Sequence, residues 1–299
     1  MPEALDRKAW LLVFVTAAVY FVSNPKPRHL YDYTFRVAGN LLHGSIGFTE
    51  KPPNWLNEFV PYEGLWYSVF PLGSVVSMVP FAFLKTLGLV TEMPAAIIYS
   101  LLAGAICLLL MEIGKLYDLP ASRIVLIACG VLFGTFMWTN LTFGGAWQLA
   151  LGFAMLGELG AIYFTVYDRR PLLAGAFFAL AFGNRTEILL TAPVLMYLLA
   201  RTAEPPASAG GETPARTHPP SHAGGSNRLR KLASFCVVPF ILGVSTLVYN
   251  YVRFHSFTDF GYARIPGVLD EPWYNQGIFS VWYIPGQAWE MLLKPWEMT

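Results

Sequence analysis

Apolar segments of membrane-spanning length recur along this chain, and they constrain its fold more than any other feature. A helix needs roughly 20 mostly apolar residues to cross the hydrocarbon core of a bilayer. Seven segments reach or approach that length, namely residues 9–24, 94–114, 124–143, 145–167, 171–183, 188–200 and 232–251. We therefore expect an all-α integral membrane protein with about seven transmembrane helices, two of them short.

Composition agrees with this fold class and excludes others. Only 13% of the 299 residues are charged, whereas a soluble domain carries about a quarter. The net charge of +1, without a basic stripe, argues against a nucleic-acid partner. All three cysteines lie inside apolar segments. We interpret them as packing residues rather than as disulfides or metal ligands.

The basic residues of the short loops predict how these segments are oriented. Segment 75–87 is apolar but short, Pro80 interrupts it, and Lys85 ends it, so we expect a surface or re-entrant helix. Every short basic turn then lies on the same side as Arg7 and Lys8, as the positive-inside rule requires. We expect a multi-pass protein of the inner (plasma) membrane with a cytoplasmic N-terminus and an uncleaved first anchor.

The parts outside the spans divide the chain further. Residues 1–251 are expected to form the membrane module, with residues 25–93 as a large first extracytoplasmic loop that carries surface helices. Residues 202–227 are rich in Pro, Ala, Gly and Ser, which is typical of a disordered cytoplasmic linker. Residues 252–299 are amphipathic and aromatic. We expect them on the outer face, as the start of a further C-terminal part.

Candidate chemistry begins in the first loop, because membrane proteins concentrate function in such segments. Asp32 opens a run, residues 33–43, that can form an amphipathic helix on the membrane surface. Asp32, Arg36 and Asn40 recur every four residues and so share one polar face. A carboxylate, a guanidinium and an amide then lie together at the water–lipid boundary. The solvated face of an ordinary surface helix explains the same pattern.

Three polar groups converge on the outer face in this topology. They are Asp32 with Arg36 and Asn40, the loop 55–67 with Glu58 and Glu63, and Arg185 in the turn of a short helical hairpin. A carboxylate can activate an acceptor hydroxyl, and a fixed cation can stabilise a phosphate leaving group. Position at bilayer depth suits a lipid-borne substrate. The pattern indicates transfer of a group from an anionic lipid to a hydroxyl.

Two short patches also carry a resemblance to a known family. A single N-terminal anchor is followed by an acidic residue that opens a helix ending in Leu-Leu-His-Gly, and later by the run 67–73, Tyr-Ser-Val-Phe-Pro-Leu-Gly. This order resembles the GT-C superfamily of polyprenyl-phosphate-dependent glycosyltransferases, near the bacterial protein O-mannosyltransferases and lipid A aminoarabinose transferases. The resemblance covers most of the chain in layout, but only residues 32–44 and 67–73 in sequence.

The resemblance implies a fold, an activity and residue roles. It implies a seven-helix module and a bacterial enzyme that moves a hexosyl or pentosyl group from a polyprenyl-phosphate donor to a lipid, glycan or protein acceptor of the cell envelope. Membrane lipids are further expected partners. Asp32 would be the catalytic residue that activates the acceptor, and Arg185 would meet the lipid phosphate. The substrate-binding residues are expected to be Arg185, Arg36, Asn40, Glu58 and Tyr67.

The chain departs from the family in its acidic residues. Many relatives place a second acid directly after the first, where Tyr33 stands here, and another at the outer end of the following helix pair, where this chain has none. A divalent metal held by two carboxylates is therefore left open as a cofactor. His29, His43 and Glu58 are alternative ligands, although His43 is also explained as the cap of its helix.

Two other functions explain the same features. A transporter or lipid flippase would use Arg185 and Glu187 as a substrate site, although transporters commonly carry internal repeats and this sequence shows none. A non-catalytic assembly subunit would only dock a partner on its outer loop. A cavity lined by both Asp32 and Arg185 would favour the enzyme.

Overall fold

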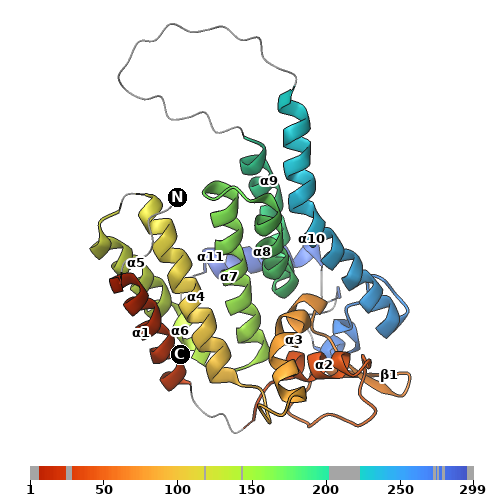
Figure 1. Ribbon diagram of the computed structural model, residues 1–299. Helices are drawn as coiled ribbons and strands as arrows, with labels where there is room; N and C mark the ends of the chain where they lie inside the picture. The colour runs from red at the N-terminus through yellow and green to blue at the C-terminus, as the bar shows by residue number, and fades with distance from the viewer. Residues whose placement is uncertain are drawn as a thin grey trace, which may run out of the picture.

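The computed structural model describes residues 7–24, 29–117, 119–142, 144–201, 223–271, 274, 276–277 and 280–294, and it is mostly helical (Figure 1). The α-helices are α1 (Arg7–Ser23), α2 (Tyr33–Leu42), α3 (Leu72–Thr86), α4 (Ala95–Leu116), α5 (Ala121–Phe133), α6 (Phe136–Thr142), α7 (Ala146–Val166), α8 (Pro171–Asn184), α9 (Ala192–Ala200), α10 (Ala223–Phe254) and α11 (Ile284–Leu292). Short 3-10 helices are η1 (Thr186–Thr191), η2 (Tyr262–Arg264), η3 (Val268–Asp270) and η5 (Val281–Tyr283). The strands β1 (Phe59–Tyr62) and β2 (Leu65–Ser68) form an antiparallel pair.

Three helices are long and apolar enough to cross a membrane, and a bent pair is a fourth candidate. α4, α7 and the part Asn227–Phe254 of α10 qualify alone, while α5 and α6, bent by 51°, qualify together. Apolar helices also lie where the other three crossings were expected, but the helices at α1, α8 and the η1–α9 unit are each only 10–17 residues long. Fewer than seven helices in the described residues therefore meet the length of a span. For α8 the cause is local, because the extended backbone of Arg185 (φ −139°, ψ 99°) ends the helix.

The helices pack as a bundle. α1 lies against α4, α4 against α7, α7 against α8, and α8 against α10. Figure 1 shows α1 and α4 at one side, α7 to α9 in the middle and α10 at the other side. The pair α2 and α3, with the β1–β2 hairpin, lies at one end of this bundle. That end carries the candidate site.

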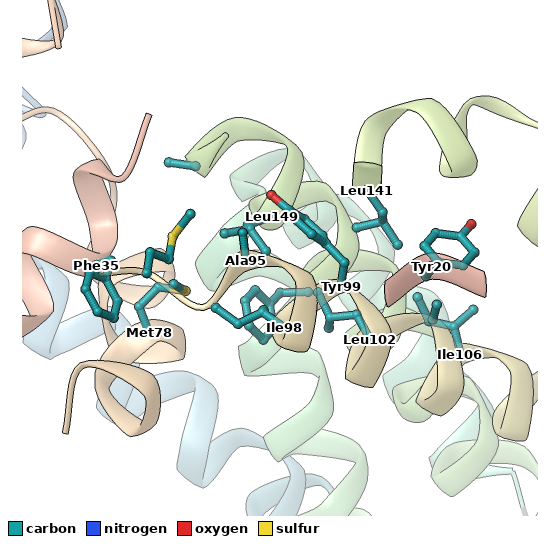
Figure 2. Close-up of a cluster of buried hydrophobic side chains, with 14 of the residues drawn as sticks. Tyr20, Phe35, Met78, Ala95, Ile98, Tyr99, Leu102, Ile106, Leu141 and Leu149 are labelled. Atoms are coloured by element: carbon teal, nitrogen blue, oxygen red, sulfur yellow. The ribbon is translucent and has the colours of Figure 1, made fainter. Parts of the chain in front are cut away.

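A large hydrophobic cluster joins the bundle to the first loop. Figure 2 shows its buried side chains, with Ile98 and Ile106 of α4 among its central members. Phe35 of α2 and Met78 of α3 belong to the same cluster. The two loop helices are therefore fixed by the core of the bundle and are not separate surface elements.

The first loop contains both elements that were expected and one that was not. α2 and α3 fall where the surface helices 33–43 and 75–87 were predicted, with Pro80 inside α3. The β1–β2 hairpin is a departure from the expected all-α fold. Its turn holds Glu63 and Gly64 at φ 48° and 82°, and a two-residue hairpin turn of type I′ requires positive φ at both positions.

Near the C-terminus, α10 starts earlier than expected. α10 begins at Ala223, so it takes in the last part of the predicted linker 202–227, because extending an existing helix by a residue costs little. Residues 202–222 of that predicted linker lie outside the described residues. The start of the predicted aromatic segment 252–299 lies against the first loop, since His255 contacts Glu63 with 3.1 Å between nitrogen and oxygen. Its location on the outer face stays a prediction.

Candidate functional site

Long-range hydrogen bonds bring the first loop to two helix ends much later in the chain. The side-chain nitrogen Nδ2 of Asn184, the last residue of α8, donates to Oγ of Ser77 at 2.9 Å. The guanidinium of Arg253, near the end of α10, donates to the backbone carbonyl of Ser68. Arg253 is fully buried and lies over the ring of Tyr249 at 3.9 Å. These contacts place the loop, the break after α8 and the end of α10 together.

A pocket of about 430 Å³ lies where these segments meet. Trp147 at the start of α7, Phe70 before α3 and Tyr262 of η2 give it aromatic walls. Arg185 and Glu187, from the break between α8 and η1, supply its charged side chains. Four parts of the chain that are distant in sequence therefore build one mixed aromatic and charged cavity.

Arg185 stands in this pocket because α8 ends one residue before it. Its Nε donates to Oε1 of Glu187 at 2.8 Å, and 31% of the Arg185 side chain is exposed. This ion pair uses one of the five N–H donors of the guanidinium. The terminal nitrogens can bind an anionic group in the same plane.

Glu58 places a carboxyl group behind the aromatic wall of the pocket. Nε1 of Trp147 donates to its Oε1 at 2.9 Å, while Oε2 is buried without a hydrogen-bond partner among the described residues. Burial raises the pKa of Glu58 to about 7, and the bond from Trp147 opposes part of that rise. Burial, with a further contribution from Glu58, raises the pKa of the Tyr262 hydroxyl to about 12. The site thus holds one group that titrates near neutral pH beside one that keeps its proton.

Asp32 immediately precedes α2 and is buried. Nε of Arg36 donates to its Oδ1 at 2.7 Å, so the predicted four-residue spacing does bring the carboxylate and the guanidinium together. Asp32 is not among the described residues that line the pocket at Arg185. That pocket is therefore not the cavity lined by both Asp32 and Arg185 that the enzyme hypothesis predicts.

The backbone next to Asp32 nevertheless approaches the pocket wall. The carbonyl of Tyr31 accepts a hydrogen bond from the N–H of Ala146 at 2.8 Å. Ala146 begins α7 and precedes Trp147, which lines the pocket. Tyr33, on the other side of Asp32, packs against Phe70 with ring centroids 5.2 Å apart.

The other predicted substrate-binding residues are distributed over two further places. Arg36 and Asn40 line a second pocket of about 320 Å³ between α2 and α3. Asn40 also donates through Nδ2 to the carbonyl of Gly47 at 3.0 Å. Tyr67 packs against Phe254 at 5.7 Å between ring centroids, and burial raises its pKa. Tyr67 therefore belongs to the hydrophobic contact between the β1–β2 hairpin and α10.

The three residues considered as alternative metal ligands do not lie close to one another. His29 stacks on Trp55 at 4.6 Å, His43 lines the second pocket, and Glu58 binds Trp147. Within the described part of the chain, no three His, Cys, Asp or Glu residues are grouped to hold a metal ion. His29, His43 and Glu58 therefore do not fit a shared metal site.

Three residues of the site were not identified from the sequence. Trp147 follows a Gly-Gly pair at the start of a span, where a tryptophan is typical of an interfacial anchor. Tyr262 and Arg253 carry no sequence signal that connects them to a loop nearly 200 positions earlier. The packing of the end of α10 brings Arg253 there, and the return of the chain after α10 brings Tyr262.

No protein-family model, curated protein or solved structure matches this chain, so the geometry of the site itself carries the functional argument.

Proposed function

We propose that this protein is a bacterial plasma-membrane glycosyltransferase with the seven-crossing GT-C layout and a cytoplasmic N-terminus. It would move a sugar from a polyprenyl-phosphate donor to an envelope acceptor on the extracytoplasmic face. The observation that carries this proposal is the pocket at Arg185, which combines a cation, aromatic walls and a nearby buried carboxyl group at the end of an apolar bundle.

Arg185 is the proposed contact for the phosphate of the lipid carrier. A guanidinium matches phosphate oxygens with several N–H donors at once. The residue lies between two short apolar helices, α8 and the η1–α9 unit, so a carrier chain can remain in the bilayer while its phosphate reaches the break. As the sugar leaves, negative charge grows on that phosphate, and Arg185 stabilises it.

Aromatic side chains are the proposed contact for the sugar. The rings of Phe70 and Trp147 lie 4.7 Å apart on one side of the pocket, and Tyr262 adds a third ring. Small-molecule sites commonly have volumes of about 300–1,000 Å³ and apolar walls with a few polar groups. A pocket of about 430 Å³ is in that range.

Two carboxyl groups can accept the proton of the acceptor hydroxyl. The family resemblance assigns this role to Asp32, which Arg36 holds at 2.7 Å. The geometry favours Glu58 as a second candidate, because it contacts the pocket wall and its pKa of about 7 suits a general base. In either case the acceptor oxygen bonds to the anomeric carbon, the carbon–phosphate oxygen bond breaks, the carboxylate takes the proton, and the configuration inverts.

The test uses membranes that contain the full chain and supply the acceptor. Undecaprenyl phosphate carrying radiolabelled mannose, glucose, galactose or arabinose is added, and transfer of label out of the lipid fraction is measured. We expect transfer from at least one donor, and a loss on the order of 100-fold in Arg185→Gln. Loss of sugar transfer in either Asp32→Asn or Glu58→Gln identifies the carboxylate that acts as the base.

Arg264→Gln is a matched control, because Arg264 pairs through Nε with Asp259 at 2.8 Å, as Arg185 pairs with Glu187. Arg264 is not among the described residues that line the pocket. Equal transfer by folded Arg185→Gln and Arg264→Gln proteins would overturn the phosphate assignment. Absence of transfer from every donor would favour the transporter or assembly-subunit alternatives.

A further inference from the structure

We propose that the second pocket, between α2 and α3, binds a phosphate group, and that an anionic membrane phospholipid presents it. The pocket has a volume of about 320 Å³ and shares no described lining residue with the pocket at Arg185. The proposal therefore concerns a separate site and does not depend on the glycosyltransferase reaction.

Positive charge reaches this pocket from both helices. Arg36 lines it from α2 and Lys85 from α3. Arg36 uses its Nε on Asp32, which leaves the four N–H donors of its terminal nitrogens. Lys85 has no carboxylate partner among the described residues, and its Nζ lies 5.9 Å from the ring centre of Phe35. No described Asp or Glu lines the pocket. Asp32 offsets the charge of Arg36 from outside it, so the positive charge of Lys85 remains for an anion to neutralise.

Neutral polar groups and open space complete the site. The amide of Asn40 and the hydroxyl of Thr86 line it beside the cations, and His43 adds a ring that carries a further N–H. Gly39 also lines it, and a Cβ built there would meet no atom within 4 Å. A tetrahedral phosphate with several acceptor oxygens suits donors that approach from different sides.

The surroundings of Lys85 favour a lipid over a soluble ion as the source of the phosphate. Phe83, Leu87 and Leu89, at the end of α3 and just after it, are exposed, Leu89 at 69%. Exposed apolar side chains next to a lysine are typical of a membrane interface, where the chain of the lysine lies along lipid and its amine reaches the headgroup. Acyl chains would cover these residues while the headgroup enters the pocket.

The binding test uses the purified full chain in a neutral detergent. Dioctanoyl phosphatidic acid, phosphatidylglycerol and phosphatidylcholine, and separately inorganic phosphate, are titrated, and affinities are measured by native mass spectrometry and by the shift of the thermal midpoint. We expect the two anionic lipids to bind and the zwitterionic lipid not to bind. Lys85→Gln should weaken anionic-lipid binding about fivefold, the effect typical of one basic residue near a lipid headgroup.

Lys51→Gln is the matched control for charge. Nζ of Lys51 also lies 5.9 Å from an aromatic ring, that of Trp66, but Lys51 is not among the lining residues. The Lys51→Gln substitution should change the affinity for anionic lipid less than twofold. Gly39→Leu should fill the pocket and abolish binding. Gly243→Leu, at a helical glycine of α10 whose added Cβ also meets nothing within 4 Å, controls for the substitution itself.

Each outcome of this experiment is decisive. Equal binding of phosphatidylcholine, equal effects of Lys85→Gln and Lys51→Gln, or unchanged binding by folded Gly39→Leu would overturn the site. Lys85-dependent binding of inorganic phosphate at the same concentrations would support the phosphate chemistry and overturn the lipid as its source. None of these results depends on sugar transfer, so failure here is distinguishable from failure of the proposed function.

Discussion

The indole N–H of Trp147 donates a hydrogen bond to the Glu58 carboxyl group across 2.9 Å, between residues 89 positions apart in the sequence. This contact joins the start of α7 to the first loop. It also holds a carboxyl group that titrates near neutral pH against the wall of the pocket at Arg185. Both the architecture and the acid–base chemistry of this end of the bundle depend on it.

Replacing Trp147 by Phe should raise the pKa of Glu58 above its value of about 7. The phenyl ring can still pack against Phe70, but the indole N–H that donates to the Glu58 carboxyl group is lost, and a donor to a carboxylate lowers its pKa. Infrared difference spectroscopy of the carboxyl stretch, with Glu58→Gln to assign the band, measures the midpoint. An unchanged or lower midpoint would contradict the proposed contact.

Replacing Glu58 by Gln should change how stability depends on pH. The folded-state pKa of about 7 lies above the ordinary glutamate value of 4.5, so the unfolded state binds fewer protons between these pH values and stability falls as pH rises from about 4.5 to 7. The contribution is on the order of 2 kcal/mol after allowance for partial exposure. The thermal midpoint of Glu58→Gln should exceed that of the wild type increasingly from pH 5 to 8. If the thermal midpoints of the two proteins change in parallel with pH, the raised pKa of Glu58 is contradicted.

Replacing Gly73 by Ala should destabilise the contact between α3 and α8. A Cβ at Gly73 would lie 2.3 Å from Cα of Gly183, which is backbone and cannot rotate away. Overpacking of this kind costs about 1–3 kcal/mol. Thermal unfolding in detergent measures the effect. Gly243→Ala is the control, because it has open space and Ala is the better helix former by about 1 kcal/mol. Equal midpoints for the two variants would refute the close approach.

Replacing Arg253 by Lys should loosen the end of α10 from the first loop, although charge is kept. Arg253 donates both to the carbonyl of Ser68 and to Oδ1 of Asn250, and a lysine amine cannot reproduce that fork. We expect a loss on the order of 2 kcal/mol and faster proteolysis after the end of α10. Arg228→Lys, at an exposed position of the same helix, should have no effect. A matching response of the two variants would contradict the role of Arg253.

Local pattern was enough to predict several elements. The four-residue spacing of Asp32, Arg36 and Asn40 predicted one face of α2, and the first two residues do form an ion pair at 2.7 Å. The apolar segments predicted a mostly helical chain with membrane-length helices. The count of seven spans stays a prediction, because α1, α8 and the η1–α9 unit are shorter than a helix needs to be to cross a bilayer.

Local sequence pattern did not predict most of the residues that form the candidate site. Arg185 was identified because a charged turn between apolar segments is unusual. Trp147 and Tyr262 were not identified, because no neighbouring residue in the sequence indicates which loop they contact. The hairpin was missed because its strands have only four residues each.

The sequence by itself determined the features that depend on neighbours along the chain: apolar length, helical periodicity, charge distribution and turns. Tertiary structure alone decided that Asp32 and Arg185 belong to different surroundings, and that Glu58 and Tyr262 lie near the pocket at Arg185 while Arg36 and Lys85 share another. The physical reason is that hydrogen bonds such as Asn184 to Ser77 form between different helices only after the apolar faces of the bundle have packed. Their partners are therefore selected by packing in space and not by spacing in the chain.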